Sequence, residues 1–506
     1  MSSIRKFAGQ TAIYGLSTIV ARLLNFVLTP FLTRSFPASV YGIFTKMYAW
    51  VSIVNPVLAL GMETTFFRYL NKQEGDKQKV YNNTFVVIAL ASIVFLAFSF
   101  LFIDDIVILL QNKQKAVNTD YALYVKYAIY ILVADALAVV PFARVRAEGR
   151  PLRFGFIKIV NIIVYITLTF FLIKFVPLII KNNLFGASFF SSWYRTSWIG
   201  YVFIANLVAS CATLVCLLPE IRKIKFEFDT KLIKEMLYYS FPVLIANISF
   251  IINENIDKIL LGKLLPPDIS AQQVGIYGAC AKIAIFLSIF VQAFRLGAEP
   301  FFLSHAKNKN SGQTYALVMN YFVIAVSLIF VAISANIEIF KYFIKSSPAS
   351  QQAIYWSGLP VVPILLFGYV SLGIYMNLSI WYKLSDQTRY GLYISGIGAV
   401  LTLVLNFLFI PQYGYMASAW ISLTAYASMM VMSYVLGQKN YPIPYNLKKN
   451  LAYLITSVVL VFVSFVVFER NLIIGNLLFL AFLAISFYIE RPELIKMFKP
   501  GTAKTN

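Results

Sequence analysis

The chain has 506 residues, of which 59% are hydrophobic and only 13% are charged, and its formal net charge is +22. A soluble domain carries about 25% charged residues, so this composition excludes a soluble fold and indicates a membrane protein whose apolar surface faces lipid. The basic residues lie in short clusters between apolar segments, which argues against a nucleic-acid partner. The three cysteines and the single histidine have no metal-ligand or disulfide spacing, so no metal and no cofactor is expected.

Fourteen apolar segments are long enough to cross a membrane, which takes about 20 helical residues. The sequence therefore predicts an all-α, polytopic membrane protein. Arg22 at the centre of the first segment, and the lack of a cleavage site, indicate a membrane helix rather than a removed signal peptide. The predicted spans cover residues 11–33, 41–66, 82–103, 121–142, 154–177, 198–218, 238–262, 274–297, 314–336, 355–378, 390–410, 415–437, 449–468 and 471–489.

The number of spans and the distribution of Lys and Arg predict the orientation of the chain. An even number of spans puts both termini on the same side of the membrane. Most Lys and Arg outside the spans then fall on that side. The positive-inside rule therefore predicts a multi-pass protein of the bacterial cytoplasmic (inner) membrane with both termini in the cytoplasm. The basic clusters are expected to set this orientation and to contact anionic lipid.

The sequence also contains a repeat, because polar landmarks coincide when the chain is shifted by 236 residues without gaps. Two six-span lobes are therefore predicted, over 1–219 and 220–438, while 439–506 hold the last two spans and a cytoplasmic tail. Lobes of this kind are typical of alternating-access transporters, with the substrate site between them. The coinciding pairs are Arg22 with Lys258, Tyr41-Gly42 with Tyr277-Gly278, Lys46 with Lys282, Ser52 with Ser288, Leu60-Gly61 with Leu296-Gly297, Glu63 with Glu299 and Arg153 with Arg389.

The first span carries a polar stripe that includes Thr18, Arg22 and Asn25. Its residues recur every three or four positions and share about 100° of arc on the helix. A polar face of this length must contact other helices or a wet cavity rather than lipid. Arg22, near mid-depth, is predicted to line that cavity, and a structural ion pair is the alternative. The full stripe is Thr11, Tyr14, Thr18, Arg22, Asn25, Thr29 and Thr33.

The seventh span repeats this design with Asn247, Glu254 and Lys258, which share about 40° of arc with Ser240. The repeat aligns Lys258 with Arg22, so the two stripes are predicted to form opposite walls of one cavity with a base on each. Such a cavity favours an anion, and a phosphate group fits best. The alternative is that Glu254 and Lys258, four residues apart on one helix, neutralise each other.

The acidic residues deepest in the predicted spans are Glu254, Asp257 and Asp135. They are candidates for binding the cation that drives transport, because ionisable residues inside a membrane are costly and are most often functional. The alternative is structural. Asp257 would then pair with another helix, and Asp135 would be a hydrogen-bonded packing residue.

Two pairs of repeat-related residues lie near helix ends. Glu63 and Glu299, near the cytoplasmic ends of their spans, are candidate gates of the cytoplasmic mouth. The alternative is a salt bridge at the helix end, with Arg68 or Arg295. Lys46 and Lys282 lie near outer helix ends, where a lysine can extend its ammonium group to the membrane interface. We expect both lysines to do so.

Several segments resemble the polysaccharide-biosynthesis membrane proteins, which are the O-antigen and capsule flippases of the multidrug/oligosaccharidyl-lipid/polysaccharide (MOP) flippase superfamily. The resemblance covers nearly the whole chain, including the layout of six, six and two spans. The segments are residues 9–17, Arg22-Leu23-Leu24-Asn25, Gly61-Met62-Glu63-Thr64, Arg146-Ala147-Glu148-Gly149-Arg150-Pro151, Ile256-Asp257-Lys258-Ile259-Leu260 and Gly275-Ile276-Tyr277-Gly278.

The resemblance implies a V-shaped pair of lobes around a cation-lined cavity, in which Arg22 and Lys258 match the expected bases. It implies flipping of undecaprenyl-diphosphate-linked oligosaccharides for O-antigen, capsule or exopolysaccharide synthesis, driven by a proton or sodium gradient. The expected partners are this polyprenyl-diphosphate-linked glycan, membrane lipids and other membrane proteins of polysaccharide assembly. The protein is therefore expected to be a transporter and not an enzyme.

Three other functions remain as alternatives. A drug/cation antiporter of the same superfamily would need an acidic cavity, whereas both predicted polar stripes carry a base. A lipid II-type flippase would share the fold and the diphosphate chemistry. A membrane glycosyltransferase or polymerase would need a long outer loop with catalytic residues, and no predicted loop is long enough to hold one.

Overall fold

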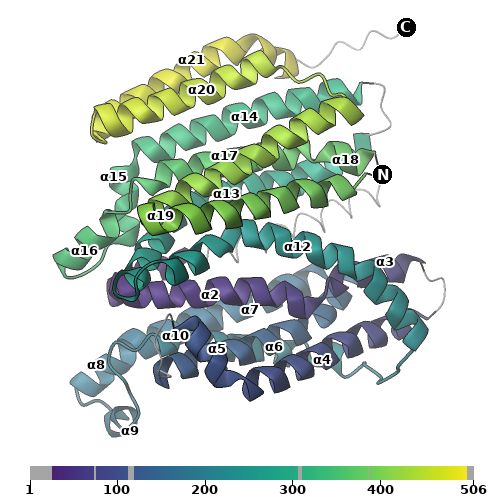
Figure 1. The fold of residues 1–506 in the computed structure, drawn as a ribbon, viewed down its shortest axis with the longest axis vertical. Helices are drawn as coiled ribbons and strands as arrows, with labels where there is room; N and C mark the ends of the chain where they lie inside the picture. The colour runs from purple at the N-terminus through teal and green to yellow at the C-terminus, as the bar shows by residue number, and fades with distance from the viewer. Residues whose placement is uncertain (1–25, 73–75, 112–118, 306–309, 386, 499–506) are drawn as a thin grey trace.

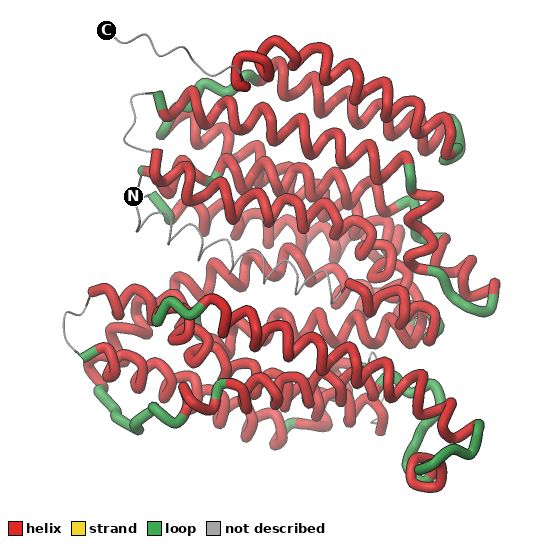
Figure 2. The backbone as a smooth tube through the Cα atoms, turned by 180° about the vertical axis from the view of Figure 1, so that it is seen from behind, coloured by secondary structure: helices red, strands yellow, loops and turns green. Residues whose placement is uncertain are grey.

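The computed structural model describes residues 26–498 with gaps at 73–75, 112–118, 306–309 and 386. The described chain contains helices and no strand, which confirms the all-α class (Figure 2). A helical segment over 26–35 comes first. The helices of the first half are α2 (Ala38–Ala59), α3 (Met62–Lys72), α4 (Lys77–Leu101), α5 (Ile103–Leu110), α6 (Thr119–Ala147), α7 (Pro151–Phe170), α8 (Val176–Lys181), α9 (Ala187–Ser191), α10 (Gly200–Cys216) and α11 (Leu218–Ile221).

The second half of the chain is built in the same way from long helices joined by short ones. Its helices are α12 (Thr230–Leu264), α13 (Pro267–His305), α14 (Ser311–Ala335), α15 (Ile337–Phe340), α16 (Ala349–Trp356), α17 (Val361–Leu378), α18 (Ile380–Leu384), α19 (Arg389–Asn440), α20 (Leu447–Phe462) and α21 (Leu472–Phe498).

The predicted spans correspond to these helices. In the described residues, 11 helices are long and apolar enough to cross a membrane. One of them, α19, covers both predicted spans 390–410 and 415–437. Gly414 has non-helical backbone angles (φ 56°, ψ −139°) and kinks α19 between the two spans. The sixth predicted span corresponds to the shorter α10. The first, 11–33, lies mostly outside the described residues.

Two groups of helices stand one above the other in Figure 1. We call α2–α10 the N-lobe and α12–α19 the C-lobe. Helix α12 packs on α2 as well as on α19, and α13 packs on α2 and on α17, so α2, α12 and α13 form the contact between the lobes. Helices α20 and α21 pack on α14 at the outside of the C-lobe. The core of the molecule therefore lies where the lobes meet.

The two ends of the bundle differ. Helices α3 and α18 lie at one end, on the right of Figure 1, and α8, α9 and α16 lie at the other. We call these the basic end and the α16 end. Three helices that start at the basic end have side-chain N-caps. Asp76 accepts from the backbone of α4, Asp229 from Leu232 N and Asn446 from Lys449 N. Such caps satisfy backbone donors at a helix start.

Close packing of α2 against α13 joins the lobes at the α16 end. A Cβ at Gly42 would lie 1.7 Å from the Ala271 carbonyl oxygen, and a Cβ at Gly275 would lie 1.8 Å from that of Ala38. Only glycine allows this backbone approach. In addition, the Tyr355 hydroxyl of α16 donates to a main-chain carbonyl just ahead of α2. The lobes are therefore in direct contact at this end, and the cavity described next lies deeper in the molecule.

Candidate functional site

A cavity of about 450 Å³ lies between the lobes. Its walls come from α2, α7 and α10 of the N-lobe, from α12, α13 and α17 of the C-lobe, and from the segment 26–35. The lining mixes aromatic and apolar side chains with a few polar and charged groups. Its main polar side chains are Thr45, Tyr48, Ser52, Asn161, Tyr165, Asn206, Glu254, Asn255, Lys258, Lys282 and Tyr369.

Helix α12 supplies the charged part of the C-lobe wall. Glu254 and Lys258 both line the cavity, as the polar stripe predicted. Their side chains do not pair with each other. Lys258 Nζ donates instead to the Glu254 backbone oxygen at 2.8 Å and to Asp257 Oδ1 at 3.0 Å. The alternative, in which the Glu254 and Lys258 side chains neutralise each other, is thus wrong, because Lys258 donates to the backbone and to the adjacent carboxylate.

Asp257 is buried behind this wall. Its carboxylate accepts from Lys258 Nζ and, through Oδ2, from the Tyr277 hydroxyl of α13 at 2.6 Å. One turn earlier, Asn253 is also buried; its Oδ1 accepts from Thr402 Oγ1 at 2.9 Å. Sequence analysis missed Asn253, although its place four residues before Asp257 puts both on one helix face. Together these groups form a polar network through α12, α13 and α19.

Lys282 of α13 is a second base on the same cavity. We had expected it to reach the membrane interface, and that interpretation was wrong, because its side chain turns inward between the lobes. The Lys258 and Lys282 ammonium groups are close enough to repel each other. Charge repulsion is strong where water is scarce. An anion placed between the two lysines would relieve it.

The described N-lobe wall is polar but neutral. Asn206 donates to the Tyr48 hydroxyl at 2.6 Å, and Asn161 donates to Thr213 Oγ1 at 3.0 Å. Behind them, Asp135 accepts from the Ser210 hydroxyl at 2.7 Å and does not line the cavity. Sequence analysis missed both asparagines. Each could have been found in the sequence as an asparagine in the middle of a predominantly apolar segment.

Three of the predicted binding residues, Thr18, Arg22 and Asn25, lie outside the described residues. The polar stripe to which they belong continues into the segment 26–35, where Thr29 lines the cavity. Its last member, Thr33, is buried and donates to the Lys345 carbonyl at 3.3 Å. The described end of the stripe therefore faces protein and cavity, as the periodicity predicted.

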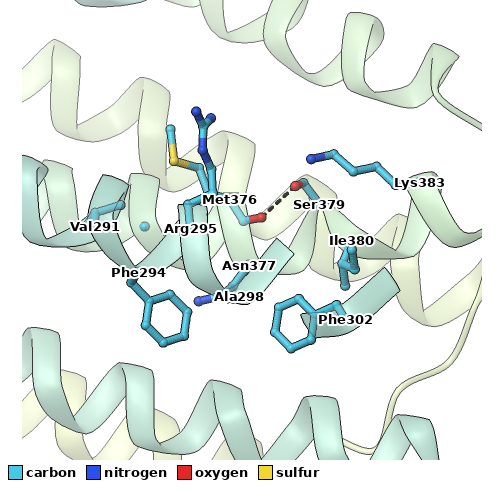
Figure 3. Close-up of a pocket in the computed structure, with 11 residues that line it drawn as sticks. Val291, Phe294, Arg295, Ala298, Phe302, Met376, Asn377, Ser379, Ile380 and Lys383 are labelled. Atoms are coloured by element: carbon cyan, nitrogen blue, oxygen red, sulfur yellow. Dashed lines mark hydrogen bonds between the residues drawn. The ribbon is translucent and has the colours of Figure 1, made fainter. Parts of the chain in front are cut away.

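Asn247 is exposed and lines a second cavity of about 510 Å³ in the C-lobe, which shares none of its described lining residues with the first. The stripe of α12 thus serves two cavities. Three bases, Arg295, Lys383 and Arg389, also line this second cavity. Arg295 and Lys383 also line a smaller neighbouring pocket; in Figure 3 their side chains lie above the rings of Phe294 and Phe302.

The two candidate gates differ in what the structure describes. Glu63 of α3 forms an ion pair with Arg146 of α6. The predicted partner, Arg68, instead stacks on the Tyr239 ring with its guanidinium carbon 3.9 Å from the ring centroid. The expected partner was therefore wrong, because α6 brings Arg146 to the same helix end. Glu299 lies within α13, and its side chain is outside the described part.

Sequence comparisons agree with this architecture. The profile of the family described as polysaccharide biosynthesis protein matches residues 7–302, and that described as MatE matches residues 242–408. No curated protein matches the chain in sequence. The matches and the arrangement of helices define a multi-pass membrane protein with the fold of the MOP superfamily.

Solved structures show the same fold at low sequence identity. The lipid II flippase MurJ in an inward closed conformation superposes with a TM-score of 0.70 at 14% identity, over 96% of this chain and 100% of that one. An inward-facing multidrug resistance transporter of the MATE family gives 0.62 at 14%, over 85% and 97%. A MOP superfamily transporter from Pyrococcus furiosus, described as having a binding pocket of reverse polarity, gives 0.58 at 13%, over 85% and 95%.

The first profile covers more than half of the chain. The chain therefore belongs to the polysaccharide biosynthesis protein family.

Proposed function

We propose that the protein is a flippase that carries undecaprenyl-diphosphate-linked oligosaccharides across the membrane, for O-antigen, capsule or exopolysaccharide synthesis. The observation that carries this proposal is the pair of bases, Lys258 and Lys282, on a cavity between two lobes. A diphosphate needs cationic donors when it leaves water, and its charge is held most strongly where the dielectric is low. The neutral amides and tyrosines opposite suit the hydroxyl groups of a sugar.

Arg22 is proposed as a third base of this site. It aligns with Lys258 in the repeat, and its stripe includes Thr29, which lines the cavity. Arginine offers a planar fork of donors that grips phosphate oxygens in pairs, whereas lysine acts as a point charge. Thr18 and Asn25 are proposed to bind along the same face. Asn247, on the second cavity, is proposed to contact the substrate on its way in.

We further propose that a proton or sodium gradient drives the cycle through Asp257, with Glu254 and Asp135 as additional candidates. Asp257 is supported by its burial beside Lys258 and Tyr277, where a cation would compete with Lys258 for the carboxylate. Binding of a cation would release Lys258 toward the cavity and so couple the ion to the anion. Glu63 and Glu299 are proposed gates of the cytoplasmic mouth.

The proposed orientation follows from charge. The loops at the basic end carry most of the Lys and Arg, so we assign this end, with both termini, to the cytoplasm. The membrane is then the bacterial inner membrane. The proposed domains are 1–219, 220–438 and 439–506. Other membrane proteins of polysaccharide assembly are proposed partners, together with the lipid-linked glycan and surrounding lipids.

Reconstitution tests this function. Purified protein in proteoliposomes would be given an undecaprenyl-diphosphate-linked oligosaccharide, lipid II or an organic cation, and an imposed ion gradient. We expect gradient-dependent movement of the oligosaccharide lipid and of neither other substrate. Movement of lipid II alone would assign the protein to lipid II flipping, and exchange of the organic cation alone would assign it to drug antiport. Either result would contradict the proposal.

A further inference from the structure

A buried lysine lies in the contact between α2 and α12, away from the central cavity. Lys46 leaves α2 on the face opposite Tyr48 and is only 5% exposed. Its Nζ lies 5.4 Å from the centroid of the Tyr121 ring of α6. A Cβ at Gly262 of α12 would lie 2.5 Å from the Lys46 Cδ, so the missing side chain there makes room for the lysine. The expectation that Lys46 reaches the membrane interface was therefore wrong.

A second ammonium group and an unsatisfied indole lie beside it. Lys263 of α12 places its Nζ 5.3 Å from the centroid of the Trp50 ring, one turn along α2 from Lys46. The charges of Lys46 and Lys263 are close enough to repel. The Trp50 Nε1–H is buried and has no hydrogen-bond acceptor among the described residues. Three donors thus gather at one place between the lobes.

Acidic residues do not balance this group. Among the described residues, neither Lys46 nor Lys263 forms an ion pair. The segments 1–25 and 112–118, which precede α2 and α6 in the chain, contain no Asp or Glu. A buried charge without a partner is strongly unfavourable, and buried lysines are ordinarily paired. The group therefore lacks an anion.

We propose that Lys46, Lys263 and Trp50 bind a phosphate group carried by a lipid. A phosphate offers several acceptor oxygens and a negative charge, so one group can accept from both ammonium groups and from the indole N–H. Lys46 and Trp50 lie on the face of α2 turned away from the central cavity, toward the α16 end, and Lys263 of α12 packs against Trp50. The site is thus distinct from the one proposed for the transported diphosphate.

A phosphate bound to Lys46, Trp50 and Lys263 would link the two lobes and so affect the transport cycle. Lys46 and Trp50 belong to α2 of the N-lobe, and Lys263 belongs to α12 of the C-lobe, which lie side by side in Figure 1. A phosphate held by all three joins the lobes near the end where Gly42 and Gly275 already touch. A ligand that binds one state preferentially shifts the equilibrium toward it. The lipid phosphate is therefore expected to stabilise the state with the α16 end closed.

Thermal unfolding of the full-length protein in phosphatidylcholine nanodiscs tests the site. Adding phosphatidylglycerol should raise the melting temperature of the wild type. Farnesyl diphosphate would also bind at the central bases, so it is tested in proteins that carry K258Q/K282Q, whose melting temperature it should still raise. In K46M/K263M this rise should be lost, while the melting temperature in pure phosphatidylcholine stays equal or increases because two unpaired charges are gone. W50F removes the indole N–H but keeps an aromatic ring for Lys263, and it should weaken the response about tenfold in ligand concentration. The matched control is K174M/K181M, which removes two exposed lysines toward the same end.

The two ligands separate the sources of the phosphate. A response to phosphatidylglycerol supports a membrane phospholipid, and a response to farnesyl diphosphate alone supports the diphosphate of a departing cargo. A response to neither ligand, or responses that K46M/K263M leaves unchanged, would overturn the proposal. If K46M/K263M does not fold, W50F decides the question, and an unchanged W50F response overturns it. No outcome depends on which glycan the protein carries.

Discussion

The two lobes, which the sequence repeat aligns, place their charges differently. At the basic end of the N-lobe the arginines are neutralised: Glu220, fully buried, accepts from Arg150 and Arg153 at 2.8 Å each. The repeat aligns Arg153 with Arg389 of the C-lobe, which is exposed and lines the second cavity together with Arg295. The same backbone position thus carries a structural ion pair in one lobe and a cavity base in the other.

The walls of the central cavity show the same contrast. The described N-lobe wall presents neutral groups, such as the Tyr48–Asn206 pair and Asn161, whereas the C-lobe wall presents Lys258 and Lys282. Among the described residues, the charged part of the cavity wall therefore comes from α12 and α13. We infer that Lys258 and Lys282, together with the proposed base Arg22, hold the anionic part of the substrate. The neutral side chains of α2, α7 and α10 contact its neutral part.

The largest expected effect comes from removing the C-lobe bases. K258Q/K282Q should lower transport of lipid-linked oligosaccharide about a hundredfold or more, because a desolvated phosphate would lose two charged donors. N161A/N206A, the matched change on the N-lobe wall, should cost about tenfold or less, because neutral hydrogen bonds contribute less. Transport in proteoliposomes, normalised to protein abundance, measures both. Equal losses in the two variants would contradict the proposed difference between the lysine wall and the neutral wall of the cavity.

A second comparison concerns the buried acids of each lobe. D257N should reduce gradient-driven transport about tenfold or more while leaving slow downhill movement, because it removes the carboxylate beside Lys258 that we propose for the cation. D135N should have a smaller effect, since Asp135 does not line the cavity and is already hydrogen-bonded to Ser210. Transport with and without an ion gradient distinguishes the two. A D257N protein that still responds fully to the gradient would exclude Asp257 as the coupling site.

The free energy of unfolding should depend on the ion pairs of Glu220 with Arg150 and Arg153. E220Q leaves Arg150 and Arg153 without their buried partner, which costs about 3–5 kcal/mol for a fully buried pair. The two arginine side chains remain 31% and 34% exposed, so solvent screening should reduce the loss to about 2 kcal/mol. R389Q in the C-lobe should change stability little. Unfolding in detergent measures both, and a stable E220Q with an unstable R389Q would reverse the comparison.

The smallest effect is expected from the cap of α12. The hydrogen bond from Lys79 and that from the Leu232 N–H lower the pKa of Asp229 from its ordinary 3.8. A lowered carboxyl pKa adds stability above the unfolded pKa, and this contribution is lost as pH falls through the folded pKa. The wild type should therefore lose slightly more stability than D229N below about pH 4. Melting curves across this range test the point, and parallel curves would contradict it.

Much of the fold followed from the sequence. Apolar length predicted the helices because a membrane requires uninterrupted helical hydrogen bonding. The predicted boundary between the spans 390–410 and 415–437 coincides with the break in α19 at Gly414. The tight contact at Gly42 and Gly275 was hidden, since it depends on which two helices meet.

The candidate site was predicted less completely. Helical periodicity placed Glu254 and Lys258 on a cavity, because residues four apart share a face. Periodicity does not say which neighbouring helix a side chain faces. Lys46 and Lys282 therefore received the same interpretation, although Lys46 is buried beside α6 and Lys282 lines the cavity. The partner of Glu63 was missed for a related reason, since Arg146 lies far away in the chain and is brought near only by packing.

Photocrosslinking of the substrate tests the central claim most directly. A benzoylphenylalanine would replace Tyr369, an aromatic residue of α17 that lines the central cavity, or Ile455, which is 61% exposed on the lipid-facing surface of α20. With radiolabelled undecaprenyl-diphosphate-linked oligosaccharide in proteoliposomes, we expect label on the Tyr369 variant and loss of that label when K258Q/K282Q is added. Label at Ile455 alone, or label at Tyr369 that survives K258Q/K282Q unchanged, would contradict the account.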